Sequence, residues 1–270
     1  IVFMHGHWCS SSTIPASDVY NESQIPMATV STNPQVTERG LKNIFRIMGR
    51  DDQQGLVAGT FLAEHFKGQK IAVVDDKSAY GKGLADEIAK AMEAKGVKPA
   101  LRESITAGEK DYSGLVSKLK SAGVGVMAFG GYHTEVALIL RQAQQAGLKL
   151  TVMGGDTMTN SELVTAAGPA ADNVFFTFAP DPRKNPSAAA VVKKFRDAKV
   201  EPEGYVMYAY AAMQLFADAA NAAKSTKYKD MEKALRSGSF DTVIGKLSFD
   251  AKGDNKLPGF MVYQWQGGKY

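Results

Sequence analysis

The chain has 270 residues, of which 44% are hydrophobic and 22% charged, and its formal net charge is +4 at pH 7. This composition is typical of a water-soluble globular protein, and the length is sufficient for two lobes of ordinary domain size. The sequence lacks the basic stripe with interleaved aromatic residues that nucleic-acid binding requires, and it lacks an apolar run long enough to cross a membrane. We interpret Cys9, the single cysteine, as a small, half-buried apolar residue.

Short apolar runs alternate with amphipathic segments along the first 178 residues. We interpret the apolar runs as strands at residues 1–4, 27–30, 45–48, 70–75, 100–104, 125–129, 151–153 and 174–178. We expect helices at residues 14–22, 53–66, 80–95, 112–122, 135–146 and 161–167, with Asp51 or Asp52 as the N-cap of the second. This alternation predicts βαβ units, and therefore an α/β fold in which mostly parallel sheets are flanked by helices.

The pattern changes after Pro180. Helices are predicted at residues 188–198, 205–224 and 229–237, followed by hairpin-like segments at residues 245–250 and 259–265 around a turn at residues 251–254. Residues that break regular structure cluster near residues 49–52, 179–182 and 254–259, where we expect hinge crossovers. We therefore predict a first lobe of residues 1–50 and 180–256, and a second lobe of residues 51–179 and 257–270.

A cluster of hydroxyl groups follows the first predicted strand. Residues 10–13 read Ser-Ser-Ser-Thr, and a helical pattern begins near Pro15. The N–H groups and the dipole of a helix N-terminus attract negative groups, and the hydroxyls add neutral donors. The turn contains no Lys or Arg and no glycine-rich cradle, so it favours a small carboxylate over a polyphosphate. Such a turn also occurs as ordinary α/β architecture, and that alternative stays open here.

Three enzyme-like interpretations are weaker. His5 and His7 would share one face of a strand as a metal pair does, but no third ligand is evident near them in the sequence. The serine cluster lacks the Gly-x-Ser-x-Gly pattern that exposes a nucleophile. Gly81-x-Gly83 is only part of a dinucleotide fingerprint, and it follows the wrong strand. We therefore predict no metal, no cofactor and no catalytic residue.

Binding of a small zwitterion fits the predicted strand ends better, because ligands of open α/β sheets bind outside the carboxyl ends of the strands. These ends supply hydroxyls, aromatic rings and one acid, namely Ser10, Ser31, Thr32, Trp8, Tyr80, Tyr132 and Asp156. An amino acid needs donors for its carboxylate, an acid for its ammonium and apolar walls for its side chain. Asp156 can instead be the N-cap of the helix near Ser161, and the tyrosines can be ordinary loop aromatics.

A series of short motifs covers nearly the whole chain. They lie at residues 6–13 (GHWCSSST), 15–17 (PAS), 32–34 (TNP), 37–40 (TERG), 50–55 (RDDQQG), 76–77 (DK), 80–85 (YGKGLA), 106–113 (TAGEKDYS), 130–133 (GGYH), 141–143 (RQA), 242–245 (TVIG) and 250–254 (DAKGD). Together, and in this order, they resemble the periplasmic leucine/isoleucine/valine-binding proteins. The resemblance implies a type I substrate-binding protein of an ABC importer, in which two α/β lobes joined by three crossovers close on an amino acid without catalysis.

The resemblance also assigns roles to residues. It implies that Ser10 and Thr32 bind the ligand carboxylate and that Asp156 binds the ammonium. Tyr80 and Tyr132 would cover the ligand from the second lobe, and Tyr205 would form an aromatic wall. Cys9, Val30 and Ser31 adjoin these residues and complete the expected site with Trp8. The implied protein is a periplasmic monomer that delivers its ligand to a membrane permease without entering the membrane, and its signal peptide is not in this sequence.

The chain departs from the family pattern in several places. Members begin with two further βα units, so the resemblance implies a first lobe that is incomplete at its N-terminus, and in some members a cysteine matching Cys9 forms a disulfide with that segment. Leucine-binding members have Glu in place of Asp156, a smaller aliphatic residue in place of Trp8, and a turn one residue longer than residues 29–32. We therefore expect a compact ligand such as alanine, proline, valine or 4-aminobutyrate rather than leucine. A ligand-sensing receptor or regulator on the same fold is the alternative.

Overall fold

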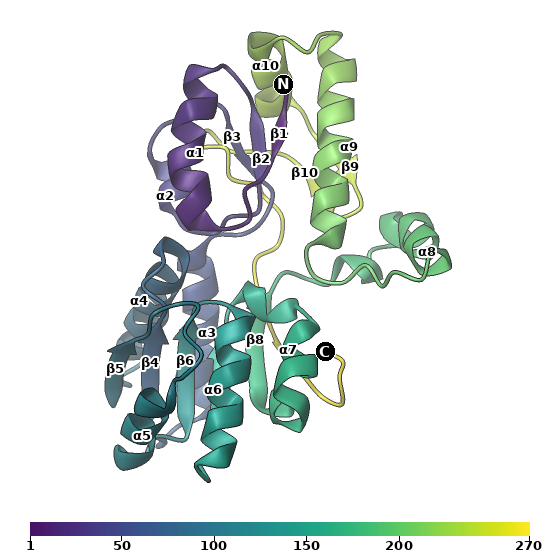
Figure 1. Ribbon diagram of the computed structural model, residues 1–270. Helices are drawn as coiled ribbons and strands as arrows, with labels where there is room; N and C mark the ends of the chain where they lie inside the picture. The colour runs from purple at the N-terminus through teal and green to yellow at the C-terminus, as the bar shows by residue number, and fades with distance from the viewer. The chain divides into compact units, whose positions relative to one another are not determined.

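The computed structural model describes residues 1–270, which divide into two compact units (Figure 1). Unit 1 consists of Ile1–Arg50 and Ala179–Gly259, and unit 2 consists of Asp51–Phe178 and Phe260–Tyr270. The chain therefore passes between the units three times. None of the helices combines the length and the apolar composition needed to span a membrane.

Unit 2 is built on a six-stranded sheet with the order β11-β8-β7-β6-β4-β5. Its strands are β4 (Ile71–Asp75), β5 (Leu101–Ser104), β6 (Val126–Gly130), β7 (Thr151–Gly154), β8 (Val174–Phe178) and β11 (Met261–Gln264). Neighbouring strands are parallel, except that β11 runs antiparallel to β8. Every residue of the central strands β4 and β6 is buried, as expected for a parallel sheet covered on both faces.

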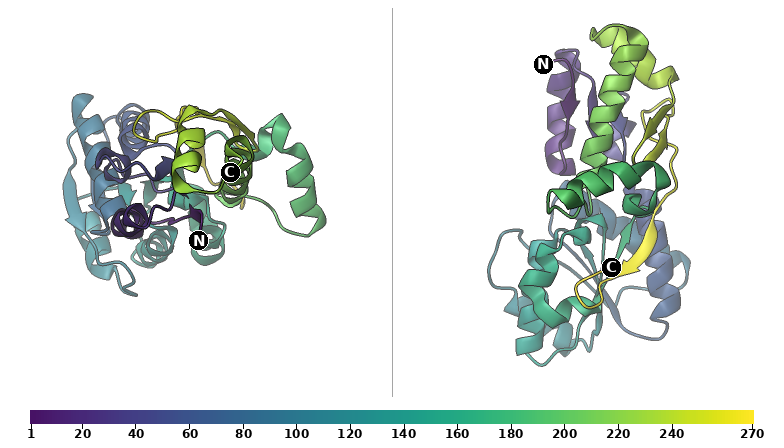
Figure 2. Two further views of the ribbon diagram at one scale, coloured as in Figure 1. Left: turned by 90° about the horizontal axis from the view of Figure 1, so that it is seen from above. Right: turned by 90° about the vertical axis from the view of Figure 1, so that its right-hand side faces the viewer.

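Helices cover both faces of this sheet (Figure 2). They are α3 (Asp51–His65), α4 (Ala79–Ala94), α5 (Ser113–Ser121), α6 (His133–Gln145) and α7 (Glu162–Ala167), and the short 3-10 helix η1 (Asp156–Thr159) follows β7. Leu62 of α3 and Ile88 of α4 pack with Val73 of β4 in one hydrophobic cluster. A Cβ atom at Gly55 of α3 would collide with Glu87 of α4, so this glycine lets the two helices approach closely.

Unit 1 contains a three-stranded parallel sheet of β1 (Met4–His5), β2 (Met27–Thr29) and β3 (Ile44–Arg46). Helix α1 (Ser10–Glu22) lies on one side of this sheet and α9 (Val206–Ala223) on the other (Figure 2). The remaining elements are α2 (Gln35–Glu38), α8 (Ala189–Asp197), α10 (Tyr228–Ser237) and the antiparallel pair β9 (Phe240–Thr242) and β10 (Gly245–Leu247).

The first strand and the first helix differ from the sequence-based expectation. Strand β1 is two residues long instead of residues 1–4, because it is an edge strand and pairs with β2 only through Met4 and His5. Helix α1 begins at Ser10, four residues before the predicted start, because Cys9 is its N-cap. The serine cluster therefore forms the first helical turn, and Pro15 lies inside the helix.

Two further expectations are wrong. Asp51 and Asp52 lie within the first turn of α3, so neither residue is the N-cap of that helix. The two C-terminal segments do not form a hairpin with each other: β10 pairs with β9 in unit 1, whereas β11 pairs with β8 in unit 2. Each strand has its hydrogen-bonding partner within its own unit, and the chain changes units after Gly259. The predicted α/β fold with mostly parallel sheets is confirmed.

Candidate ligand-binding site

The turn between β1 and α1 presents a helix N-terminus that no side chain caps. The N–H groups of Ser12 and Thr13 both donate to the carbonyl of Cys9 at 3.0 Å. No acidic residue stands in the first turn. A helix N-terminus carries a partial positive charge, so the turn is suited to an anionic group of a ligand.

Hydroxyl groups from β2 and the following residues hold this turn in place. Thr29 Oγ1 donates to the carbonyl of His7 at 2.8 Å, and Ser31 Oγ lies 3.0 Å from the same carbonyl and 2.9 Å from that of Trp8. Ser31 Oγ is also 2.6 Å from Thr13 Oγ1 of α1. The side chain of Ser31 is fully buried, so the structure places it in the framework of the turn.

Ser10 and Thr32 stand beside this framework. Ser10 Oγ accepts a hydrogen bond from the N–H of Asn33 at 3.3 Å, and its own hydroxyl hydrogen can still donate. Thr32 follows Ser31 directly, and both Ser10 and Thr32 are about 2% exposed or less. Val30 is also buried, whereas Cys9 is half-buried. The structure thus gathers five predicted residues at the carboxyl end of β2 and the start of α1.

The side chain of Arg46 holds the backbone around Ser31 and Asn33 in place. Its Nη1 donates to the carbonyls of Ser31 at 3.0 Å and Asn33 at 2.7 Å, and its Nε donates to Asp254 Oδ1 at 2.7 Å. Asp254 also accepts from Arg50 at 2.9 Å. Burial alone raises the pKa of Asp254, but the charge of Arg46 and the hydrogen bonds from Arg46 and Arg50 outweigh burial and hold that pKa below its usual value.

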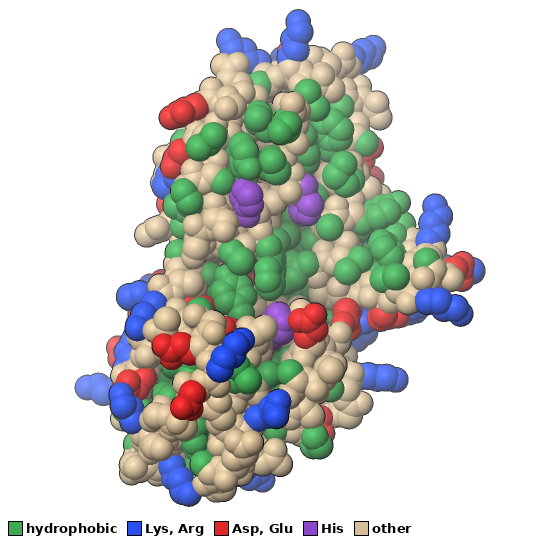
Figure 3. Space-filling view, in the orientation of Figure 1, with side chains coloured by type: hydrophobic (Ala, Val, Ile, Leu, Met, Phe, Trp, Pro, Cys, Tyr) green, Lys and Arg blue, Asp and Glu red, His purple; other side chains and the backbone are tan.

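Two aromatic rings of unit 1 stand near the turn. The Trp8 ring meets the Tyr205 ring edge to face, with centroids 5.5 Å apart, and Tyr205 is the residue before α9. Trp8 is 39% exposed and is one of several large exposed hydrophobic residues of unit 1, with Ile1, Val2, Val19, Val200, Tyr210 and Met213. Figure 3 shows hydrophobic side chains gathered on the visible face of this unit. An aromatic pair of this kind offers apolar surface to a ligand side chain.

In unit 2, Asp156 is the first residue of η1, directly after β7 and Gly155. Its Oδ1 accepts hydrogen bonds from the Tyr80 hydroxyl at 2.9 Å and from Gln54 Nε2 at 3.0 Å. Asp156 is not the N-cap of α7, because Ser161 occupies that position. The helix-cap alternative is therefore wrong for α7. A Cβ atom at Gly155 would collide with the Tyr80 hydroxyl, so glycine permits this contact.

The surroundings of Asp156 oppose its charge. Burial raises the pKa of Asp156 to about 6, although the hydrogen bonds from Gln54 and Tyr80 act in the opposite direction. Burial and the neighbouring charge of Asp156 raise the pKa of Tyr80 well above its usual value. The ring of Tyr132, the residue before α6, lies 5.5 Å from the Tyr80 ring. A buried acid that is hydrogen-bonded to one ring of an aromatic pair is suited to a ligand cation.

The two histidines of β1 and its turn are occupied elsewhere. His5 Nδ1 lies 3.3 Å from the carbonyl of Ala28, and His7 Nε2 lies 3.1 Å from the hydroxyl of Tyr20. The structure contains no group of three or more His, Cys, Asp or Glu residues arranged to hold a metal ion.

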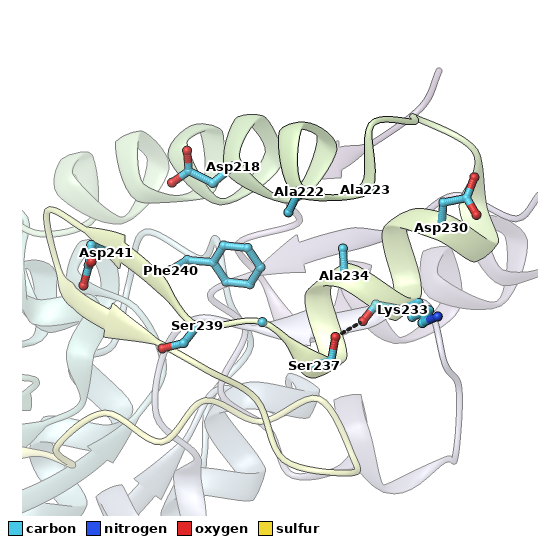
Figure 4. A pocket seen from close by; sticks show the side chains of 11 residues that line it. Asp218, Ala222, Ala223, Asp230, Lys233, Ala234, Ser237, Ser239, Phe240 and Asp241 are labelled. Carbon is cyan, nitrogen blue, oxygen red and sulfur yellow. Dashed lines mark hydrogen bonds between the residues drawn. The ribbon is translucent and has the colours of Figure 1, made fainter.

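A separate cavity of about 670 Å³ lies in unit 1 among α9, α10 and β9 (Figure 4). Its walls include Asp218 and Ala222 of α9, Lys233 of α10, and Phe240 and Asp241 of β9. None of the predicted binding residues lines it. It is also not at the carboxyl ends of parallel strands, where α/β proteins bind their ligands.

The sequence did not indicate Arg46, Gln54 or Asp254 as parts of the site. Gln54 lies within the motif at residues 50–55, but nothing in that pattern shows that its side chain points to Asp156. A polar residue on a helix is usually exposed, and the available signal was only its position three residues after Asp51 on the same helix face.

Comparison with known proteins identifies the family of the chain. The family described as periplasmic binding protein matches residues 1–269. The Leu/Ile/Val-binding protein homolog 1 of Brucella melitensis is 52% identical over 270 residues, which cover 99% of this chain and 73% of the relative. The leucine-, isoleucine-, valine-, threonine- and alanine-binding protein of Pseudomonas aeruginosa is 43% identical over 98% of this chain and 72% of its own length.

A solved structure is similar as well. The leucine-binding protein of Thermotoga maritima matches with a TM-score of 0.91 and 25% identity, over 100% of this chain and 78% of that protein. The family match spans almost the whole chain, and the sequence identity to the curated relatives is high over nearly its full length. The chain therefore belongs to the periplasmic binding protein family, within the Leu/Ile/Val-type substrate-binding proteins of ABC importers that its motifs resemble, and it is a binding protein and not an enzyme.

Proposed function

We propose that this protein captures a free amino acid outside the cytoplasm and delivers it, as a monomer, to the membrane permease of an ABC importer. The observation that carries the proposal is the buried carboxylate of Asp156, which Tyr80 and Gln54 hold at the carboxyl end of β7. A carboxylate in this setting is stabilised by a cation, and the α-ammonium of an amino acid supplies one. The names of the Brucella and Pseudomonas relatives support the same class of ligand.

The carboxylate of an amino-acid ligand also needs hydrogen-bond donors. We propose that the ligand carboxylate binds to the N-terminus of α1 with the hydroxyls of Ser10 and Thr32, while the ammonium binds to Asp156 of unit 2. Backbone N–H groups and hydroxyls recognise a carboxylate without adding a full positive charge. A free amino acid carries an ammonium and a carboxylate in one small molecule, so it can satisfy both sets of partners.

Trp8 and Tyr205 define the expected side-chain preference. The indole of Trp8 fills space that an aliphatic residue would leave open, so a branched ligand with an additional methylene overlaps with it. One methylene in an apolar pocket changes the binding free energy by roughly 1–3 kcal/mol. We propose that compact ligands, such as alanine, proline, valine and 4-aminobutyrate, bind more tightly than leucine.

A thermal-shift screen of the common amino acids and 4-aminobutyrate tests the proposal. A ligand that binds only the folded protein stabilises it by roughly 2.7 kcal/mol at a concentration of 100 times Kd. The expected result is a clear rise in Tm with compact aliphatic amino acids and none with their decarboxylated amines. If no amino acid raises Tm at millimolar concentration, the proposed function is wrong.

A further inference from the structure

The side chain of Gln54 uses its full hydrogen-bonding capacity inside unit 2. Its Nε2 donates to Asp156 Oδ1 at 3.0 Å and to Asp51 Oδ1 at 2.9 Å. Its Oε1 accepts from the backbone N–H of Asp156 at 2.8 Å and from the Thr177 hydroxyl at 2.8 Å. An amide group has two donor hydrogens and two acceptor lone pairs, and all four are engaged here.

These contacts fix the orientation of the amide. If the nitrogen and oxygen of Gln54 exchanged places, the oxygen would face the carboxylates of Asp51 and Asp156, and the nitrogen would face the N–H of Asp156. Both arrangements are repulsive. Gln54, Thr177 and Asp51 are fully buried, so solvent water cannot readily take the place of a lost hydrogen bond, and the loss is energetically costly.

The residues joined by Gln54 occupy special places in the chain. Asp51 is the first residue of unit 2 after the crossing at Arg50. Thr177 immediately precedes Phe178, where the first segment of unit 2 ends and the chain crosses to unit 1. Asp156 and Gln54 are 102 residues apart along the sequence. Gln54 therefore forms hydrogen bonds with Asp156 and with one residue beside each of these two crossings, Asp51 and Thr177.

We infer that Gln54 is a positioning residue, which holds the Asp156 carboxylate ionised and in one orientation and links it to the two crossings at Asp51 and Phe178. The inference rests on the proposed role of Asp156 in binding an ammonium group. Gln54 contributes twice to that role: its Nε2 stabilises the negative charge, and its Oε1 anchors the backbone of the same residue. The ligand then meets a charge that is already oriented, which lowers the cost of binding.

The titratable groups that share these contacts are Tyr80 of α4, which donates to Asp156 Oδ1, and Asp51 of α3, which shares the Gln54 amide. Thr177 of β8 contacts Gln54 with a hydroxyl that does not titrate. Loss of the Nε2 donor removes a hydrogen bond that favours the ionised form of Asp156. The proton affinity of Asp156 is therefore expected to rise when Gln54 is replaced by an apolar residue.

The test compares Gln54→Met with Gln53→Met, which makes the same change at the preceding, exposed position of α3. The first measurement uses ligand-free protein and follows the carboxyl carbon of Asp156 by NMR as the pH is varied, with Asp156→Asn to assign the signal. The expected result is a titration midpoint about one pH unit higher in Gln54→Met and unchanged in Gln53→Met.

The second measurement is the affinity for L-valine between pH 5 and pH 8. In Gln54→Met, affinity at pH 7 is expected to fall about tenfold, and the pH at which affinity declines is expected to rise by the same amount as the NMR midpoint. A purely structural role would lower stability without moving either midpoint. If Asp156 titrates alike in wild type and Gln54→Met, the inference is overturned.

A second variant keeps the test decisive if Gln54→Met does not fold. Thr177→Val removes one of the two donors to Gln54 Oε1, while both contacts of Nε2 remain. The titration midpoint of Asp156 is therefore expected to rise, but by less than in Gln54→Met. An unchanged midpoint overturns the inference. The two ideas are separable. If wild-type protein binds no L-valine or other amino acid, the proposed function fails, whereas the NMR titration still decides the role of Gln54.

Discussion

At the scale of single residues, Asp156 combines burial with two hydrogen-bond donors. Burial is the larger effect, since it raises the pKa of this carboxyl to about 6 in spite of Gln54 and Tyr80. Its unfolded value is near 3.8. Between these two values the folded chain holds a proton that the unfolded chain releases. Asp156 therefore costs the ligand-free protein stability as pH rises through this window, and the cost is complete above pH 6.

The substitution Asp156→Asn tests this cost. Asparagine keeps the shape but carries no charge, so the penalty of ionisation disappears. Each unit of pKa corresponds to about 1.4 kcal/mol. The free energy of unfolding of the variant, measured relative to wild type, should therefore be about 3 kcal/mol higher at pH 7 than at pH 4. Urea unfolding of ligand-free protein at the two pH values measures the difference. Asp218→Asn, the same change at an exposed position of unit 1, is the control. The argument would be contradicted if the stability difference between variant and wild type were the same at pH 4 and pH 7.

Trp8 allows a second prediction at this scale. Replacing its indole by a smaller aliphatic group in Trp8→Leu should enlarge the space for the ligand side chain. The ratio of the L-leucine Kd to the L-valine Kd is expected to fall by at least about tenfold, as measured by calorimetry. Tyr210→Leu removes another exposed aromatic ring of unit 1 and should leave the ratio unchanged. An unaltered ratio in Trp8→Leu removes Trp8 from the pocket.

The residues predicted from sequence were those next to strand ends. Asp156, Ser10 and Thr32 were predicted because polar residues that follow buried strands gather at the carboxyl ends of each parallel sheet. The residues that hold them were not found. Gln54 reaches Asp156 across 102 positions, and Arg46 reaches Asp254 across 208. Contacts of this kind depend on tertiary packing, which neither periodicity nor composition reveals.

At the scale of elements, the turn between β2 and α2 depends on a buried ion pair. The guanidinium of Arg46 is fully buried and holds the carbonyls of Ser31 and Asn33 in addition to Asp254. The pair also joins β3 to the segment near residue 254, because Arg46 and Asp254 form an isolated parallel bridge. The geometry of the segment after β2, which carries Ser31 and Asn33, therefore depends on this arginine.

Arg46→Met should destabilise the ligand-free protein by about 3–5 kcal/mol, because it leaves Asp254 with less compensation for its burial. Arg39→Met is the matched control, since Arg39 pairs with the exposed Asp18 and should cost less than about 1 kcal/mol. Urea unfolding measures both changes. Equal losses in the two variants would show that the Arg46 network contributes no more than a surface pair.

Element boundaries were predicted well where a buried strand or a helix has a clear hydrophobic pattern of its own. Strand β8 matches residues 174–178, and α4 differs from residues 80–95 by one residue at each end. The predictions failed where the bounds or the pairing of a strand depend on which other strand it pairs with. Residues 1–3 are apolar but pair with no strand, and the apolar pattern of β11 did not reveal β8 as its partner.

At the scale of the whole molecule, each unit is assembled from segments that are distant in the chain. Strand β11 completes the sheet of unit 2 after the third crossing, and Asp254 completes the polar network of unit 1 just before it. Local sequence patterns do not specify such partners, whereas the order of motifs along the chain indicated the family that the comparison confirms. The account built on this fold is that an amino acid is bound through its two opposite charges and is released unchanged.

The most direct test is a calorimetric titration of L-valine into wild-type protein and Asp156→Ala at pH 7. Removing the carboxylate leaves the ligand ammonium without its partner, which costs roughly 3–5 kcal/mol. We expect the variant to bind at least about a hundredfold more weakly than wild type while it remains folded. A loss of less than about tenfold would show that Asp156 does not bind the ammonium group, and would contradict the account.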